Sequence, residues 1–159
     1  MLSIDISINK QQLTLKKGTT ILETFPISSA KNGVGNKNNS GCTPLGLHQI
    51  KIKIGANLPI NSVFIGRRPT GEIYSPQLAQ EFKNRDWILS RILWLQGMEI
   101  GINRGQGIDS LKRFIYIHGT PDSEPMKIPL SCGCIRMRNH DIIKLFDLTP
   151  TKTLVNIKL

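Results

Sequence analysis

Residues 115–137 read IYIHGTPDSEPMKIPLSCGCIRM, and this stretch decides how the rest of the chain is interpreted. It begins with a short apolar run that is typical of a buried strand and that ends at His118-Gly119. Cys134 lies sixteen residues after His118, and Gly133 directly precedes it. The stretch therefore predicts a histidine at the end of one strand and a cysteine in a glycine-containing turn.

These residue types suit nucleophilic catalysis. A cysteine thiolate is a strong nucleophile, and an imidazole that titrates near neutrality can take the thiol proton. A glycine at position 133 lets the backbone approach a reacting carbonyl, so the amides of Gly133 and Cys134 are candidate donors to an oxyanion. Ser131 and Arg136 add polar groups beside them. A cysteine and a histidine in one chain also occur as purely structural residues, and the residue types alone leave both interpretations open.

The net charge of the chain limits the classes of binding partner but does not select one of them. The chain has 21 Lys and Arg against 11 Asp and Glu, a net charge of +10, which favours an anionic partner. Nucleic acid, acidic lipid and carboxylate-rich cell-wall peptide all qualify. An arginine-rich arm and zinc-finger spacings are absent, so nucleic acid is suggested by charge alone.

The three cysteines, Cys42, Cys132 and Cys134, are interpreted as thiols in a reducing compartment. An odd, small number does not suit a disulfide framework. The Cys-x-Cys spacing also differs from that of structural zinc sites. We therefore predict neither a metal nor a cofactor.

Hydropathy patterns predict one mostly-β domain over residues 1–159. Alternating or compact apolar runs predict short strands at 2–8, from 13, and at 21–27, 50–54, 63–65, 88–95, 114–117 and 154–157. Two short helices are expected, one opened by Ser75-Pro76 and ending near Lys83, the other over 140–146 with Asn139 as its N-cap. The Ser, Asn and Gly-rich residues 28–46 are expected to form a long loop, and its length favours a functional role.

The N-terminal residues and the length of the apolar runs indicate where in the cell the protein is expected. No apolar run approaches the roughly 20 residues that a membrane span needs. The opening residues MLSIDISINK lack the features of a signal peptide. The sequence as written is thus expected to be cytoplasmic, or periplasmic or cell-wall-associated if a leader has been removed.

The pattern as a whole resembles the L,D-transpeptidase catalytic domain family, the YkuD type. The resemblance rests on His118-Gly119-Thr120 followed by Ser-x-Gly-Cys-Ile-Arg-Met at 131–137. The opening IDISINKQQLTL looks like the family's first strand pair, and Thr43-Pro44-Leu45-Gly46 resembles its turn before the next strand. The resemblance runs from about Ile4 to Ile157 and implies a β-sandwich or barrel-like domain with a few short helices.

The resemblance also implies roles. Cys134 would be the nucleophile, His118 the base, and Gly119 would hold the imidazole through its backbone carbonyl. The amides of Gly133 and Cys134, with the position of Cys132, would line the oxyanion region.

The remaining candidate residues have roles that stay open. Ser131 and Arg136 would shape the site, with Arg136 either contacting a substrate carboxylate or forming a structural ion pair. The residue two before the nucleophile is usually histidine in the family, and here it is Cys132, interpreted as a tolerated small residue. Arg104, in the Gly101–Gly107 loop, is expected near the cleft and facing the anionic substrate.

By resemblance, the chain would cleave peptidoglycan stem tetrapeptides before the terminal D-alanine through a thioester, and carbapenem-type inhibitors would acylate it. An amine acceptor makes the enzyme an L,D-transpeptidase. Water as acceptor makes it an L,D-carboxypeptidase of cytoplasmic recycling. A non-catalytic wall-peptide-binding domain is the alternative of another class, and it predicts a broken Cys-His pair, whereas both residues are present.

Overall fold

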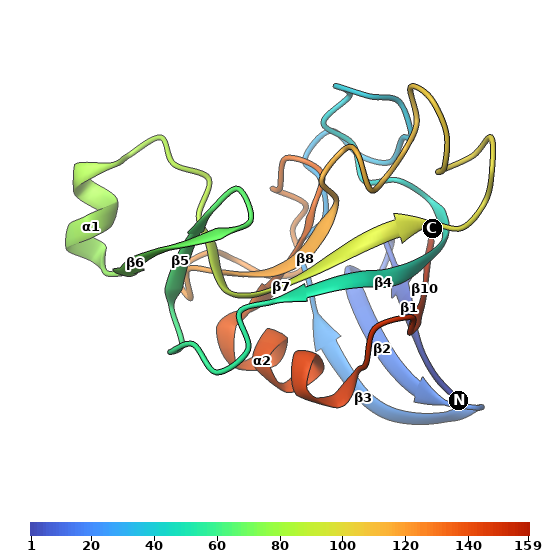
Figure 1. Ribbon diagram of the computed structural model, residues 1–159, viewed down its shortest axis with the longest axis horizontal. Coiled ribbons are helices and arrows are strands. Elements are labelled where there is room, and N and C mark those ends of the chain that lie inside the picture. Colours follow the sequence, from blue (N-terminus) through green and yellow to red (C-terminus); the bar gives the residue numbers. More distant parts are fainter.

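The computed structural model describes all 159 residues, which form ten strands and two helices (Figure 1). In chain order the elements are β1 (Leu2–Ser7), β2 (Gln12–Lys17), β3 (Thr20–Pro26), β4 (Gly46–Ile54), β5 (Ser62–Ile65), β6 (Arg68–Ile73), α1 (Pro76–Glu81), β7 (Ile88–Gly97), β8 (Tyr116–Thr120), β9 (Ile135–Arg138), α2 (Asn139–Leu148) and β10 (Leu154–Lys158). The prediction of a mostly-β chain with two short helices is confirmed.

All ten strands belong to one curled sheet (Figure 1). Its main path runs β3-β2-β1-β10-β4-β7-β5-β6, and β8 and β9 branch from β7. The first three strands form the antiparallel meander that the N-terminal alternation predicts. Ile4 and Ile6 on β1 lie opposite Leu15 and Leu13 on β2, and all four side chains are buried. Period-two alternation therefore places one face of the meander in the core.

The stretch that contains His118 and Cys134 lies in the branch of the sheet. β8 pairs with β7 in antiparallel and with β9 in parallel orientation. Helix α2 packs across β7, β8 and β9 and contributes Ile142, Leu145 and Phe146 to the main core. The branch is thus held on one side by the largest apolar cluster of the molecule, which gives the other side a rigid support.

Two sequence predictions about local structure need correction. Arg138, not Asn139, occupies the N-cap of α2, and it makes no capping side-chain hydrogen bond. Asn139 is fully buried, donates to the Thr120 carbonyl at 2.8 Å and accepts from Ser90 Oγ at 2.6 Å. Its side chain therefore links α2 to β7 and β8 instead of capping the helix. Strands β6 and β9 were not expected, because neither has a clear apolar alternation.

Neither helix has the length and apolar content of a membrane-spanning helix, and α2, the longer, has ten residues.

A buried histidine away from the motif influences stability. His48 on β4 is inaccessible to solvent, and its Nδ1 and Nε2 lie 2.9 Å from the Gly46 carbonyl and 2.8 Å from Ser110 Oγ. Burial lowers the pKa of His48 to about 4. Burial also lowers the pKa of His118.

We expect the free energy of unfolding to fall as the pH drops from 6.5 towards 4. In that range the unfolded chain binds a proton at His48 and the folded chain does not, which costs up to roughly 3 kcal/mol for this residue. Urea unfolding of the wild type and of His48→Gln, each at pH 7 and pH 4.5, checks this. The variant should lose less stability between the two pH values, and an equal loss would contradict the prediction.

Candidate active site

Strand register brings the motif residues together. His118 on β8 lies beside Arg136 on β9 in the parallel ladder. Their neighbours Ile117, Ile135 and Met137 are buried in the main core. Because side chains alternate across a strand, His118 and Arg136 face the opposite side, where one cleft also includes Cys134.

Cys134 sits at the base of this cleft just before β9. Its Sγ accepts a hydrogen bond from the Tyr116 amide at 3.3 Å and donates one to the Phe114 carbonyl at 3.4 Å. The residue packs against a small apolar cluster that includes Ile92 and Tyr116. Burial raises the pKa of the Cys134 thiol to about 12. The resting sulfur is thus a protonated thiol.

His118 is a neutral imidazole that lines the same cleft as Cys134. Its Nδ1 lies 2.7 Å from the Gly119 carbonyl, which can only accept, so Nδ1 carries the hydrogen. The neutral ring then has a free lone pair on Nε2. Burial lowers the pKa of His118, which keeps the ring neutral at physiological pH.

Gly119 also has a steric role. A Cβ at this position would lie 2.5 Å from both the Leu89 carbonyl oxygen and Asn139 Oδ1. The orienting carbonyl therefore comes from a residue that has no room for a side chain.

Residues 131–134, which include the predicted nucleophile Cys134 and are called the nucleophile turn here, are fixed by two hydroxyl groups. Ser131 Oγ donates to the Cys134 carbonyl at 2.5 Å and accepts from the Gly133 amide at 3.2 Å. Thr43 Oγ1 donates to the Gly133 carbonyl at 2.9 Å and accepts from the Ala30 amide at 3.0 Å. Segment 28–46, expected as a loop with a function, thus supports the nucleophile turn.

The backbone N–H groups of the turn differ in whether they are free to donate a hydrogen bond to a substrate. The Gly133 amide is engaged by Ser131 Oγ, whereas the amides of Cys132 and Cys134 have no hydrogen-bond partner within the chain. Gly133 has a φ of 135°, a conformation that favours glycine, and this shapes the turn. Of the two amides predicted to meet an oxyanion, the Cys134 amide is thus the unengaged one. Cys132 is exposed and lines the cleft.

Three arginines line the cleft, and this set differs from the two arginines expected from the sequence. Arg136 pairs with Asp86 at 3.1 Å, which supplies the structural ion pair that the sequence left open. Arg67 and Arg113 also line the cleft, and neither was identified from the sequence. Arg104 is exposed in the 101–107 loop and is not among the cleft residues, so the structure does not bring it to the site.

Phe114 is a further site residue that sequence reasoning missed. Its φ of 58° is rare for a bulky side chain, and its carbonyl accepts the Cys134 thiol. The predicted strand 114–117 begins at Tyr116 instead, so Phe114 lies two residues before β8, and this place near the histidine strand was the one available signal. Arg113, the residue before Phe114, had the same signal, whereas Arg67 and Asp86 had none, because each reaches the cleft from a segment distant in sequence.

Fold and site together define a curled β-sheet domain whose cleft is lined by a cysteine and a histidine. The model of the L,D-transpeptidase catalytic domain, YkuD, matches residues 2–157. The chain belongs to this family, as its motif residues predict.

Solved structures show the same fold at low identity. An L,D-transpeptidase from Mycobacterium smegmatis is 14% identical, with a TM-score of 0.59, and the match covers 99% of this chain and 58% of that one. An L,D-transpeptidase in complex with imipenem is 18% identical, with a TM-score of 0.59 and the same coverage. L,D-transpeptidase 3 from Mycobacterium tuberculosis, in complex with a faropenem-derived adduct, is 12% identical, with a TM-score of 0.60 and coverage of 99% and 60%.

This chain thus spans about three fifths of the length of these solved relatives. No curated protein matches the chain in sequence.

Proposed function

We propose that this chain is an L,D-transpeptidase that acts on peptidoglycan stem tetrapeptides through a thioester on Cys134. The observation that carries the proposal is the shared cleft of Cys134 and His118, with the imidazole oriented by the Gly119 carbonyl. A binding domain has no need of a neutral base beside a thiol. Family membership supports the substrate class.

The proposed acylation begins when Cys134 Sγ passes its proton to His118 Nε2 and attacks the carbonyl of the third stem residue. The resulting oxyanion is stabilised by the unengaged Cys134 amide. When the intermediate collapses, the bond to D-alanine breaks and the leaving amine takes the proton from His118. The products of this half-reaction are free D-alanine and a thioester.

The thioester is then resolved by an amine of a second stem peptide. His118 removes the proton from that amine as it attacks, and the proton returns to Sγ when the thioester breaks. Water in place of the amine gives the L,D-carboxypeptidase reaction. The cleft is open to solvent beside the exposed Cys132, an observation that keeps water as the second candidate acceptor.

The test is mass spectrometry of the products formed from purified disaccharide-tetrapeptide. Cross-linked dimers and free D-alanine are expected with the wild type and should be absent with Cys134→Ala. Tripeptide and D-alanine without dimers would instead identify water as the acceptor. The absence of both products would contradict the proposal and favour a wall-peptide-binding domain.

β-Lactams give an independent readout of the same nucleophile. Relatives of this fold were solved with imipenem and with a faropenem-derived adduct. We expect imipenem to add its mass to the intact wild-type protein. Cys134→Ala should remain unmodified, and Cys42→Ser is the matched control that should still be acylated.

A further inference from the structure

We propose that Arg67 is the residue that binds a carboxylate of the donor stem peptide. This inference rests on the proposed function, because it names the group of the substrate that the cleft recognises. It follows from the partners of the three arginines at the cleft and from the position of the hairpin that carries Arg67.

Two of the three cleft arginines are already committed within the protein. Arg136 pairs through Nη2 with Asp86 at 3.1 Å, so its charge is already matched by a carboxylate, although its buried Nε has no hydrogen-bond partner; its side chain is 14% exposed. Arg113 is bound to the loop beside the nucleophile turn, donating to the Cys42 carbonyl at 2.7 Å and to the Gly35 carbonyl at 3.2 Å. Their hydrogen bonds hold the walls of the cleft together.

Arg67 has no acidic partner and no backbone carbonyl as acceptor. Its one hydrogen bond to a side chain runs from Nη1 to Tyr116 Oη at 3.3 Å. A guanidinium has five N–H donors in a planar fork that matches a carboxylate. Most of the donors of Arg67 therefore remain available at the cleft.

Aromatic rings hold the guanidinium of Arg67 in place. It lies 4.6 Å from the ring centroid of Phe114 and 5.3 Å from that of Trp94. Both contacts are within the range of cation–π attraction. Because Tyr116 Oη accepts from Arg67, its own hydroxyl hydrogen remains free to donate. Arg67 and Tyr116 thus offer two neighbouring donor groups, held before a substrate arrives, which reduces the entropy lost on binding.

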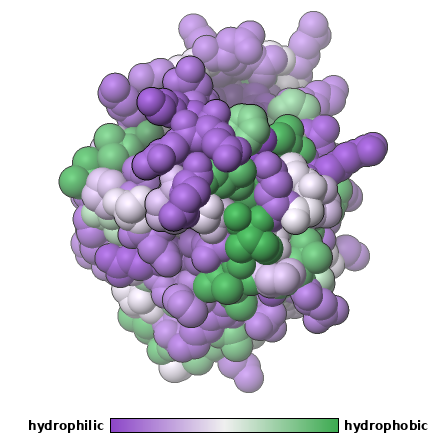
Figure 2. Space-filling view, turned by 90° about the vertical axis from the view of Figure 1, so that its left-hand side faces the viewer, coloured by the Kyte–Doolittle hydropathy of each residue, from purple (hydrophilic) through white to green (hydrophobic).

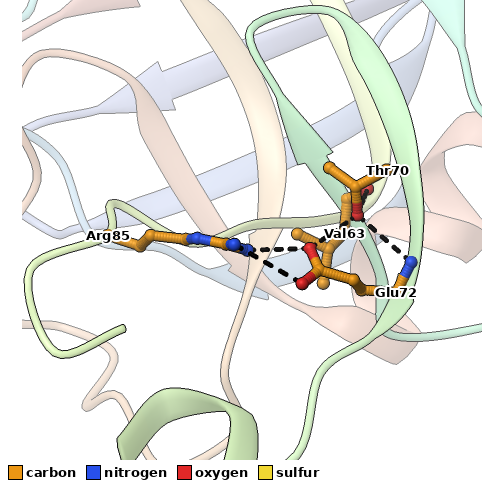
Figure 3. Close-up of polar contacts among 4 residues, drawn as sticks. All are labelled: Val63, Thr70, Glu72 and Arg85. Atoms are coloured by element: carbon orange, nitrogen blue, oxygen red, sulfur yellow. Dashed lines mark hydrogen bonds and ion pairs between the residues drawn. The ribbon is translucent and has the colours of Figure 1, made fainter. Parts of the chain in front are cut away.

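The hairpin that carries Arg67 is itself anchored. Arg67 lies in the tight turn between β5 and β6. Arg85 binds both carboxylate oxygens of Glu72 on β6, at 2.8 and 3.4 Å (Figure 3). Thr70 Oγ1 donates its one hydrogen to Glu72 Oε1 at 2.8 Å and also lies 3.4 Å from the Val63 carbonyl oxygen. These contacts join the two strands of the hairpin to the segment that follows α1.

That segment connects the hairpin to the catalytic strand. Arg85 binds Glu72, and the next residue, Asp86, binds Arg136 on β9. Two consecutive residues thus tie the hairpin to the strand that follows Cys134. The end of the molecule that carries the hairpin and α1 shows a strip of apolar surface between hydrophilic side chains (Figure 2).

Of the carboxylates of a stem tetrapeptide, two belong to the residues on either side of the bond that is cleaved, and these are the candidate ligands of Arg67. One is the terminal carboxylate of D-alanine, and the other is the side-chain carboxylate of diaminopimelate at the third position. The chemistry of recognition is the same for both, so substrate analogues must distinguish them.

The test measures equilibrium binding by calorimetry in the Cys134→Ala background, where no turnover occurs. We expect Arg67→Gln to weaken binding of the tetrapeptide by about tenfold or more, since it removes hydrogen bonds to a charged group. Arg67→Lys should restore part of the affinity. Arg68→Gln is the matched control: the neighbouring arginine is exposed but does not line the cleft, and its loss should change the affinity by less than about twofold.

Two analogues identify the carboxylate. One has a terminal carboxamide, and the other has lysine in place of diaminopimelate. The protein that keeps Arg67 and carries only Cys134→Ala is called the Arg67 protein. It should bind one of the two analogues about as weakly as the Arg67→Gln variant binds the natural peptide. For that analogue, Arg67→Gln should weaken binding no further.

Equal affinity of Arg67→Gln and the Arg67 protein for the natural tetrapeptide would overturn the inference. An equal loss on all three peptides, or no binding of the tetrapeptide by the Arg67 protein, would also overturn it. Failure of the proposed function is a separate result, because it appears as absent D-alanine release by the wild type.

Discussion

Replacing His118 with glutamine is expected to lower kcat/KM for D-alanine release by roughly three to four orders of magnitude. Burial raises the pKa of the Cys134 thiol to about 12, so the sulfur depends on a base to become nucleophilic. His118 is the neutral base that shares its cleft, and glutamine cannot take a proton. The measurement is the steady-state rate with disaccharide-tetrapeptide, supported by the rate of Cys134 alkylation.

The control for this variant is His140→Gln. His140 is exposed on α2 and does not line the cleft, so its loss should leave kcat/KM unchanged. The wild-type rate should also have an acidic limb below pH 6.5, because the lowered pKa of His118 keeps the ring neutral down to lower pH. Activity in His118→Gln within tenfold of the wild type would contradict the assignment of His118 as the base.

Replacing Thr43 with valine is expected to destabilise the protein by about 2–4 kcal/mol and to reduce activity strongly. Valine has the shape of threonine but lacks the hydroxyl that accepts from the Ala30 amide and donates to the Gly133 carbonyl. Thr43 is completely buried, so both backbone groups would be left without a partner. The nucleophile turn would also lose one of its two hydroxyl anchors.

Urea unfolding measures the first effect, and D-alanine release measures the second. Thr43→Ser keeps the hydroxyl and should retain most of the stability and the rate. Thr43→Val within about 0.5 kcal/mol of the wild type would show that the turn is held without this residue.

Sequence reasoning succeeded where a signal was local. Alternating apolar residues predicted β1 and β2, because a half-buried strand requires period two whatever it pairs with. Sequence reasoning failed where tertiary contacts decide the role of a side chain. Asn139 is a good N-cap residue, yet the buried carbonyl of Thr120 and hydroxyl of Ser90 bind its amide group. Arg104 and Arg67 are both arginines beside glycines, and nothing local indicates which of them reaches the cleft.

The sequence by itself determined the strands other than β6 and β9, the family, and Cys134 and His118 as the candidate pair, because each of these depends on residue types at short, fixed spacings. The tertiary structure alone decided which amides of the nucleophile turn are unengaged, which arginines line the cleft, and how the hairpin of Arg67 is tied to β9. Those features depend on contacts between segments far apart in the chain. Such contacts exist only once the sheet has curled and brought the segments together.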